Sequence, residues 1–288
     1  MLDVTRKLVE LLDLVPLGDD HFQGESENLG FPNVFGGQVL GQGLMAAGRT
    51  VEGRLPHSMH AYFLRPGNHR LPIDYEVQRV RDGGSFSVRR VIARQGGKEI
   101  LTGSVSFQVD EDGFEHQIDM PPAPDVNSLK SEQEYSEMLK RHTPEALQTA
   151  LTRERPIEIR PVDPVNPLRP EPRPPHKQSW LRAQGQLPDD PILHRCLLAY
   201  ASDFSFLGTS LNPHAVTFMS RDMQVATLDH ALWFHRDFRI DDWLLYDTDS
   251  PSASGGRGFN RGNFFSSDGT LVASTTQEAL IRRRKKPA

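Results

Sequence analysis

The sequence predicts an α+β protein built from two tandem repeats, each with an antiparallel sheet wrapped around a central helix. Three observations lead to this fold class. Similar residues recur at a constant offset of 171 residues, so that residues 62–65 (YFLR) return as residues 233–236 (WFHR). Each half carries several segments whose apolar residues alternate, as in strands with one buried face. Each half also contains one mostly apolar helical segment, which a surrounding sheet would bury.

Length and composition narrow the class of protein further. A chain of 288 residues can bury one large core or two ordinary ones. A formal net charge of −5 and a charged fraction of 25% exclude a basic nucleic-acid-binding domain and general disorder. No apolar run approaches the roughly 20 residues of a membrane-spanning helix. The single Cys196 cannot form an internal disulfide, and the N-terminus carries no export signal, so we expect a cytoplasmic protein.

The first repeat is predicted over residues 1–115. It begins with an amphipathic helix in the first fifteen residues, followed by a buried helix at 35–51 that contains five glycines. Each interior glycine costs about 1 kcal/mol relative to alanine, so we expect these glycines to permit a close backbone approach. Four strands follow, with a hairpin turn at Gly96-Gly97. These strands are predicted at residues 57–64, 73–80, 85–94 and 100–109.

Residues 116–155 have a different composition and are predicted to connect the repeats, with a polar helix at 128–151.

The second repeat is predicted over residues 156–288. Seven prolines within residues 160–176 favour an extended, exposed chain near its start. A helix is expected at 191–206, and Asp268-Gly269 should form a hairpin turn. Strands are predicted at residues 157–161, 178–184, 224–235, 243–248, 258–265 and 270–281.

Several familiar site patterns are excluded or weak. The segment 41–46 matches a dinucleotide-binding pattern, but its glycines lie inside a helix and no acidic residue follows at the required distance. No serine-nucleophile elbow or phosphate-binding loop is present. Cys196 lies on an apolar helix face, which favours a buried structural thiol. His57 and His60 lie an odd number of residues apart on a predicted strand, as do His230 and His235. The two side chains of each pair therefore point to opposite faces of the sheet, so we expect no metal site and no cofactor.

Three polar residues of the second repeat are the candidates for chemistry. Asp203 lies late in a mostly apolar helix, where a carboxylate opposes the helix dipole and is costly to bury. Gln277 shares a strand face with small and apolar residues, where a buried amide needs hydrogen-bond partners. At the constant offset its counterpart is Ser106. Thr227 is an ordinary strand residue and is the weakest of the three by itself.

Arginines on strands or adjacent loops are candidates for binding phosphate groups, although structural ion pairing is the alternative for each one. The basic C-terminal segment 282–286 is interpreted as a solvated end. The candidates for binding phosphate are Arg89, Arg90, Arg257 and Arg261.

Seven motifs along the chain resemble those of the acyl-CoA thioesterase II family, a double-hotdog family, nearly from end to end. The resemblance implies a hydrolase that cleaves acyl-CoA to a free acid and coenzyme A. It also implies a catalytic triad at Asp203, Thr227 and Gln277, and a homodimer or homotetramer. The family is cytoplasmic, or peroxisomal in eukaryotes. The motifs are residues 34–39 (VFGGQV), 57–67 (HSMHAYFLRPG), 85–90 (SFSVRR), 200–203 (YASD), 226–230 (ATLDH), 233–236 (WFHR) and 274–278 (STTQE).

Under this interpretation, Asp203 takes a proton from a water molecule that attacks the thioester carbonyl. Thr227 and Gln277 hold that water in line. The amide of Gly37 or Gln38 is a candidate donor to the oxyanion. Two alternatives stay open, namely another hotdog enzyme such as an enoyl-CoA hydratase, and a non-catalytic acyl-CoA-binding module.

Overall fold

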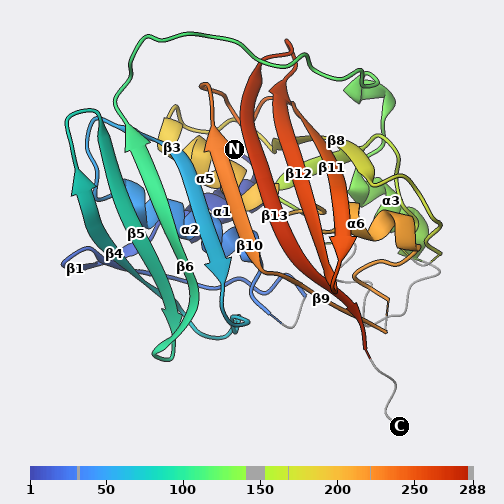
Figure 1. The fold of residues 1–288 in the computed structure, drawn as a ribbon, viewed down its shortest axis with the longest axis horizontal. Coiled ribbons are helices and arrows are strands. Elements are labelled where there is room, and N and C mark those ends of the chain that lie inside the picture. The colour runs from blue at the N-terminus through green and yellow to red at the C-terminus, as the bar shows by residue number, and fades with distance from the viewer. Residues whose placement is uncertain (31–32, 141–152, 168, 221, 285–288) are drawn as a thin grey trace.

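The computed structural model of the protein describes residues 1–30, 33–140, 153–167, 169–220 and 222–284. One large antiparallel sheet runs through it, in the order β1-β2-β4-β5-β6-β3-β10-β13-β12-β11-β8-β7, with β9 paired to β13. Figure 1 shows the sheet curving in front of the helices, with α2 and α5 behind its centre. This arrangement confirms the predicted α+β class with helices wrapped by an antiparallel sheet. None of the described helices is both long and apolar enough to cross a membrane.

The elements of the first half follow the predicted order, and each of the four predicted strands lies within two residues of its expected bounds. A short hairpin of two additional strands, β1 and β2, was not predicted. Its turn contains Asp19 and Asp20 with φ angles of 50° and 58°. The elements are α1 (Asp3–Leu12), β1 (Val15–Gly18), β2 (His21–Gly24), α2 (Gly36–Gly48), β3 (Leu55–Phe63), β4 (Ile73–Asp82), β5 (Phe86–Gln95) and β6 (Lys98–Gln108).

The second half repeats this plan, but the helix predicted at 191–206 ends at Ser202 and the strand predicted at 243–248 continues to Ser254. The single strand predicted at 224–235 is two strands, β9 and β10, because the register against β13 shifts by one residue around Leu228. The elements are β7 (Ile157–Pro161), β8 (His176–Ala183), α5 (Pro191–Ser202), α6 (Gly208–Leu211), η3 (Asn212–His214), β9 (Met223–Thr227), β10 (Asp229–Phe234), β11 (Leu244–Ser254), β12 (Arg257–Ser266) and β13 (Leu271–Arg283).

The two halves are related as the sequence offset indicates, with a slip of one residue in the last strand. The offset of 171 carries Phe86–Gln95 onto Arg257–Ser266. In the first half His60 pairs with Ser104, and in the second half Ala231 pairs with Thr276. The residue of β6 that corresponds to Gln277 is therefore Val105, and the expected counterpart Ser106 is wrong. Burial agrees with this, since Val105 and Gln277 are both fully buried.

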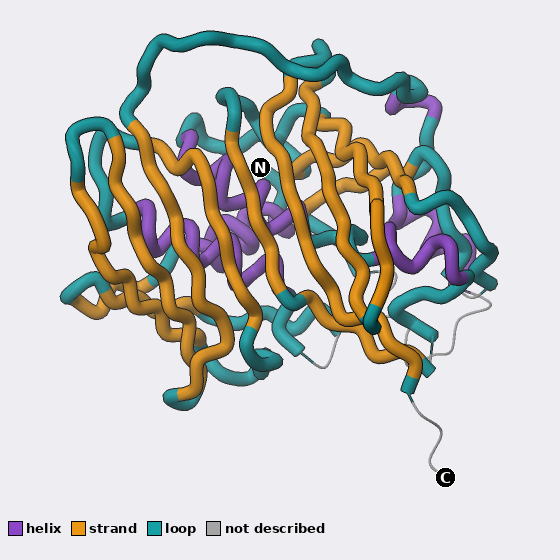
Figure 2. The backbone as a smooth tube through the Cα atoms, in the orientation of Figure 1, coloured by secondary structure: helices purple, strands orange, loops and turns teal. Residues whose placement is uncertain are grey.

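The connection between the halves covers part of the sheet. Figure 2 shows a long loop crossing from the end of β6 along the top of the sheet towards the second half. The indole N–H of Trp180 donates to the Pro124 carbonyl at 3.0 Å. The connection contains η1 (Val126–Ser128) and α3 (Glu132–Leu139). Only the first part of the helix predicted at 128–151 is thus observed, and residues 141–152 lie outside the described residues.

Glycines let the two central helices approach closely. A Cβ atom on Gly37 would lie 2.2 Å from the Tyr200 carbonyl, and one on Gly41 would lie 2.9 Å from the Cys196 carbonyl. The expected close backbone approach is confirmed at Gly37 and Gly41, whereas Gly43 has only ordinary contacts. Cys196 is fully buried at this crossing, and burial raises the pKa of its thiol far above the ordinary value. The thiol is therefore an unreactive part of the core.

Candidate active site

Asp203 lies where the two repeats meet. It directly follows α5, at the C-terminal cap, so it opposes the dipole of its own helix. Its Oδ2 atom accepts a hydrogen bond from the Gly37 N–H at 2.9 Å. Gly37 is in the first turn of α2, the central helix of the other repeat. The partial positive charge of that helix end, together with an otherwise unpaired amide, stabilises the carboxylate.

The N-terminus of α2 is open to Asp203 because its own sequence does not close it. Phe35 occupies the cap position, and its side chain makes no capping hydrogen bond. The next residue, Gly36, leaves space for the acid, since a Cβ atom there would lie 2.7 Å from Asp203 Oδ2. A glycine-rich first turn therefore admits a carboxylate from a distant part of the chain.

The other two residues of the predicted triad contact the same carboxylate. The Gln277 side-chain NH₂ donates to Asp203 Oδ1 at 2.7 Å. The Thr227 side chain also lies close to Asp203 and acts to lower the pKa of its carboxyl group. Gln277 comes from β13 and Thr227 from the end of β9, and the register pairs Thr227 with Ala279 on the strand that carries Gln277. The structure thus brings the three predicted residues together.

Burial and hydrogen bonding act on Asp203 in opposite directions. Loss of hydration is the dominant effect and raises the pKa of the carboxyl group above that of an ordinary aspartate. The contacts with Gln277, Gly37 and Thr227 oppose this rise because they favour the ionised form. An aspartate with a raised pKa is a better proton acceptor than a free one.

A cavity of about 430 Å³ opens beside the carboxylate, and Asp203 and Thr227 both line it. One part of its wall is apolar and aromatic, with Phe35, Tyr200 and Phe204 in mutual ring contact. The wall continues along the chain that follows α5, through Leu207, Leu211 and residues 216–219. Such a cavity suits an extended apolar group whose reactive atom lies next to Asp203.

The cavity also has cationic groups that sequence reasoning missed. Arg153, Arg155 and Lys177 line it. The ammonium group of Lys177 donates to the Ser205 carbonyl at 3.2 Å, and burial lowers its pKa. The proline-rich segment before β8 brings Lys177 to this wall. Nothing in the local sequence distinguishes Lys177 from an ordinary exposed strand lysine, so its position could not be predicted.

The four arginines predicted to bind phosphate lie elsewhere. Arg89 is 1% exposed, and its guanidinium group is held by Thr50, Asp82 and backbone carbonyls. Arg90 is exposed on β5, and Arg261 is paired with Asp249 at 2.7 Å. None of the four is among the residues that line the cavity beside Asp203.

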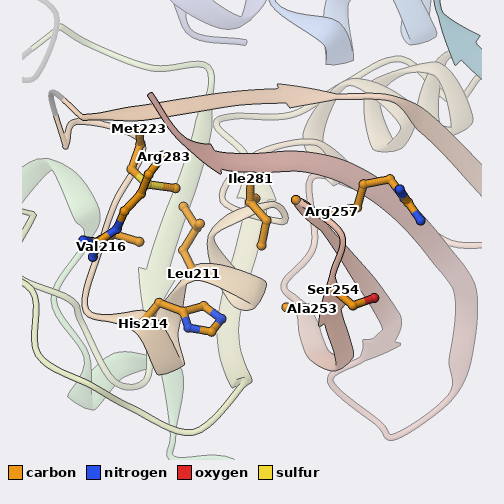
Figure 3. A pocket seen from close by; sticks show the side chains of 10 residues that line it. Leu211, His214, Val216, Met223, Ala253, Ser254, Arg257, Ile281 and Arg283 are labelled. Atoms are coloured by element: carbon orange, nitrogen blue, oxygen red, sulfur yellow. The ribbon is translucent and has the colours of Figure 1, made fainter. Parts of the chain in front are cut away.

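Arg257 lies at a second pocket of about 320 Å³, next to the β11–β12 turn. Figure 3 shows Leu211, Val216 and Ile281 inside this pocket, with the head group of Arg257 directed away from them. Leu211 and Val216 line both pockets, so the two are neighbours. Arg257 is also bonded to Glu278 at 2.9 Å. Within the part of the chain that the structure describes, no group of three histidine, cysteine or acidic residues could hold a metal ion.

Comparisons with known proteins identify the family. The family model described as "Acyl-CoA thioesterase" matches residues 146–280, and "Acyl-CoA thioesterase N-terminal domain" matches residues 25–108. The acyl-CoA thioesterase 2 of Haemophilus influenzae is 43% identical over 283 residues, which cover 98% of this chain and 99% of that protein. This chain belongs to the acyl-CoA thioesterase family.

Solved structures agree with the family and with the fold. An acyl-CoA thioesterase II from Mycobacterium marinum is 40% identical, with a TM-score of 0.78, and the match covers 96% of this chain and 99% of that one. A protein with a hot dog fold from Alicyclobacillus acidocaldarius is 20% identical, with a TM-score of 0.77 over 98% of this chain and 99% of its own. The predicted double-hotdog fold of the acyl-CoA thioesterase family is thereby confirmed.

Proposed function

We propose that this protein hydrolyses fatty acyl-CoA to a free fatty acid and coenzyme A in acyl-CoA metabolism, with Asp203, Thr227 and Gln277 as its catalytic residues. The observation that carries the proposal is the carboxylate of Asp203, held by Gln277 and by the N-terminus of α2 beside an apolar cavity. Membership of the acyl-CoA thioesterase family supports the substrate class.

In the proposed mechanism Asp203 is the general base. Its carboxylate takes a proton from a water molecule as the water oxygen forms a bond with the thioester carbon. Thr227 and Gln277 fix the carboxylate and the water in an attacking position, so that little entropy is lost in the transition state. The tetrahedral intermediate then collapses, the carbon–sulfur bond breaks, and the proton held by Asp203 neutralises the departing thiolate.

The thioester oxygen becomes negative in the intermediate and needs a donor. The two amides named from the sequence are both engaged, since Gly37 donates to Asp203 and Gln38 donates to the Phe35 carbonyl at 3.1 Å. We therefore propose the N–H of Gly36, the first residue of α2, as the donor to the oxyanion. It lies at the same helix end, where the dipole favours developing negative charge.

We propose that the acyl chain occupies the apolar part of the cavity. For coenzyme A, the candidates Arg90, Arg257 and Arg261 stay predictions, and Arg153, Arg155 and Lys177 are added because they line the cavity. Arg89 is the least suited of the original four, since its hydrogen-bond donors are directed to Thr50, Asp82 and backbone carbonyls within the protein. A series of single alanine substitutions, with kcat/KM measured on acyl-CoA and on the matching acyl-pantetheine, separates phosphate contacts from all others.

The alternative of an enoyl-CoA hydratase has less support. Such an enzyme needs an aspartate and a histidine that both face the double bond of the substrate. His230 is the histidine nearest to this network, and both of its ring nitrogens contact protein groups, Gln277 and Ser202. A non-catalytic binding module does not require a half-buried carboxylate with a raised pKa such as that of Asp203.

The direct test is release of coenzyme A thiol from a series of acyl-CoA substrates of increasing chain length. We expect turnover by the wild type, and no hydration of enoyl-CoA. Absence of thiol release across the series would refute the proposed activity.

We further propose a cytoplasmic homodimer or homotetramer, with repeats bounded at residues 115 and 156. Support comes from the sheet face opposite the central helices, which no described helix covers in Figure 1. Sedimentation equilibrium tests the assembly, and a monomer at micromolar concentration would contradict it.

A further inference from the structure

We propose that His230 is a positioning residue that holds the Gln277 amide in the one orientation that presents its NH₂ group to Asp203. The inference rests on the proposed function, because it assigns a purpose to the Asp203–Gln277 contact. His230 lies on β10, is fully buried, and does not line the cavity beside Asp203. Its effect on the reaction is therefore exerted through Gln277.

The direction of each hydrogen bond in this network follows from its neighbours. The Ser202 hydroxyl donates to the Ala199 carbonyl at 3.0 Å, so its oxygen is an acceptor towards His230 Nε2, 3.0 Å away. His230 therefore carries its proton on Nε2, and its Nδ1 is a bare acceptor. The Gln277 NH₂ donates one hydrogen to that Nδ1 at 3.1 Å and the other to Asp203 Oδ1 at 2.7 Å.

This arrangement matters most when Asp203 is protonated during the reaction. An ionised carboxylate by itself attracts the NH₂ end of Gln277. Once Asp203 has taken a proton from water, its O–H can donate to the amide oxygen just as well, and the amide would be free to rotate by half a turn. His230 opposes that rotation, because a rotated amide would set its oxygen against the bare Nδ1, two acceptors with no hydrogen between them.

The electrostatic state of His230 supports this role. Burial lowers its pKa to about 3, so the ring stays neutral at every pH at which the enzyme would work. A neutral ring keeps Nδ1 free as an acceptor. It also adds no positive charge that would lower the basicity of Asp203.

The first repeat shows that the fold itself does not need a histidine at this position. The offset of 171 makes Met59 the counterpart of His230, and the strand register agrees. Met59 pairs with Leu232, and His230 pairs with Ala61 in the symmetric position. Both side chains are fully buried. In the first repeat the apolar Met59 lies beside Val105 of the neighbouring strand. In the second repeat His230 takes the place of Met59, and Gln277 takes the place of Val105.

The test compares variants of this one position in the intact protein. His230→Met reproduces the first repeat, so we expect it to fold, and kcat should fall about 10- to 100-fold with little change in KM. His230→Asn places an oxygen near the position of Nδ1 and should restore kcat to within about threefold of the wild type. In a Gln277→Ala background, His230→Met should change kcat less than about twofold. His194→Asn is the matched control, since His194 is also a buried histidine but contacts Pro188 and Ile240 instead.

Three kinetic results would overturn the inference. They are a wild-type kcat in His230→Met, a His230→Asn variant as impaired as His230→Met, and an undiminished effect of His230→Met in the Gln277→Ala background. Nitrogen NMR of histidine-labelled wild type tests the same arrangement without any substitution. We expect a neutral ring protonated on Nε2, and protonation on Nδ1 would contradict the proposal. If the wild type itself releases no coenzyme A, the proposed function fails, whereas a failure confined to the variants refutes only the role of His230.

Discussion

The two central helices, α2 and α5, occupy corresponding places in the two repeats but end in opposite ways. At the N-terminus of α5, the Asp190 side chain accepts from the amides of Ile192 and Leu193. At the N-terminus of α2 no side chain of its own makes such a bond. At the C-terminal caps the charges are reversed, with Arg49 after α2 and Asp203 after α5. Only one of the two helix junctions combines an open N-terminus with an acid.

We propose that this difference gives the two repeats separate roles in one site. Arg49 suits a helix C-terminus, and Asp203 opposes one, so the first repeat has the arrangement that favours stability. The Asp203 arrangement is tolerable because the acid reaches the positive end of the other helix. In our proposal, each repeat contributes one part of a single site, the first an activating helix end and the second the base.

The segments that follow α2 and α5 also differ, in length and in what they contribute to the cavity. Six residues, 49–54, join α2 to β3, whereas twenty residues, 203–222, join α5 to β9. The longer connection contains α6 and η3, and it supplies much of the wall of the cavity beside Asp203. The second repeat therefore carries both the acid and the cavity wall that the first repeat lacks.

The largest expected effect comes from the residues that cap the two helices. Asp203→Asn should lower kcat about 100-fold or more, because the general base is lost while the side-chain shape is kept. Arg49→Gln changes the corresponding position of the first repeat and should leave kcat within about twofold of the wild type. Thiol-release kinetics on both variants, with circular dichroism to establish folding, make the comparison. Similar losses in the two variants would mean that the caps are not specialised.

The next largest effect on kcat is expected at Gln277 on β13, compared with Val105 at the corresponding position of β6. Gln277→Ala should lower kcat about 10- to 100-fold with KM nearly unchanged, because the lost contact orients the base and the water. Val105→Ala, at the corresponding position, should cost about 1–3 kcal/mol of stability and leave kcat unchanged. Steady-state kinetics and urea denaturation measure the two quantities. A rise in KM alone for Gln277→Ala would mean that Gln277 binds substrate and does not position water.

Glycines of α2 provide a smaller effect on stability. Gly37→Ala would place a Cβ atom 2.2 Å from the Tyr200 carbonyl, and we expect a loss of about 1–3 kcal/mol because the backbone of α5 must move. At Gly43 the nearest atoms to an added Cβ lie at 3.5 Å or more, which is ordinary contact. Gly43→Ala should therefore be neutral or stabilising by up to about 1 kcal/mol. Equal destabilisation of both variants would contradict the close approach at the α2 N-terminus.

The smallest effect is the pH dependence of stability that Asp203 contributes. Its pKa is higher in the folded protein than in the unfolded chain, so the folded state binds the proton more tightly. As pH rises from the ordinary aspartate value through the raised one, the wild type should lose stability relative to Asp203→Asn, by about 1.4 kcal/mol for each unit of pKa difference. Urea denaturation from about pH 4 to about pH 8 measures this. A relative gain in stability with rising pH would mean that the hydrogen bonds outweigh burial.

Sequence patterns predicted most of this fold because alternation and turns are local. The hairpin β1–β2 was not predicted, because each strand has only four residues and the turn relies on Asp19 and Asp20 in left-handed conformations. Asp203, Thr227 and Gln277 were each identified from the residues or the family resemblance. The contact between Asp203 and Gly37 joins residues 166 positions apart, and no local pattern carries it. A slip of one residue between β6 and β13 likewise concealed that Val105, not Ser106, corresponds to Gln277.

The central claim is that each chain has one productive site, at the junction of Asp203 with the N-terminus of α2. Isothermal titration with a non-hydrolysable thioether analogue of acyl-CoA, on the wild type and on Asp203→Asn, tests it most directly. We predict one equivalent bound per chain in both proteins, with hydrolysis of true acyl-CoA lost only in the variant. Two equal binding sites per chain, or wild-type hydrolysis by a folded Asp203→Asn protein, would contradict the account.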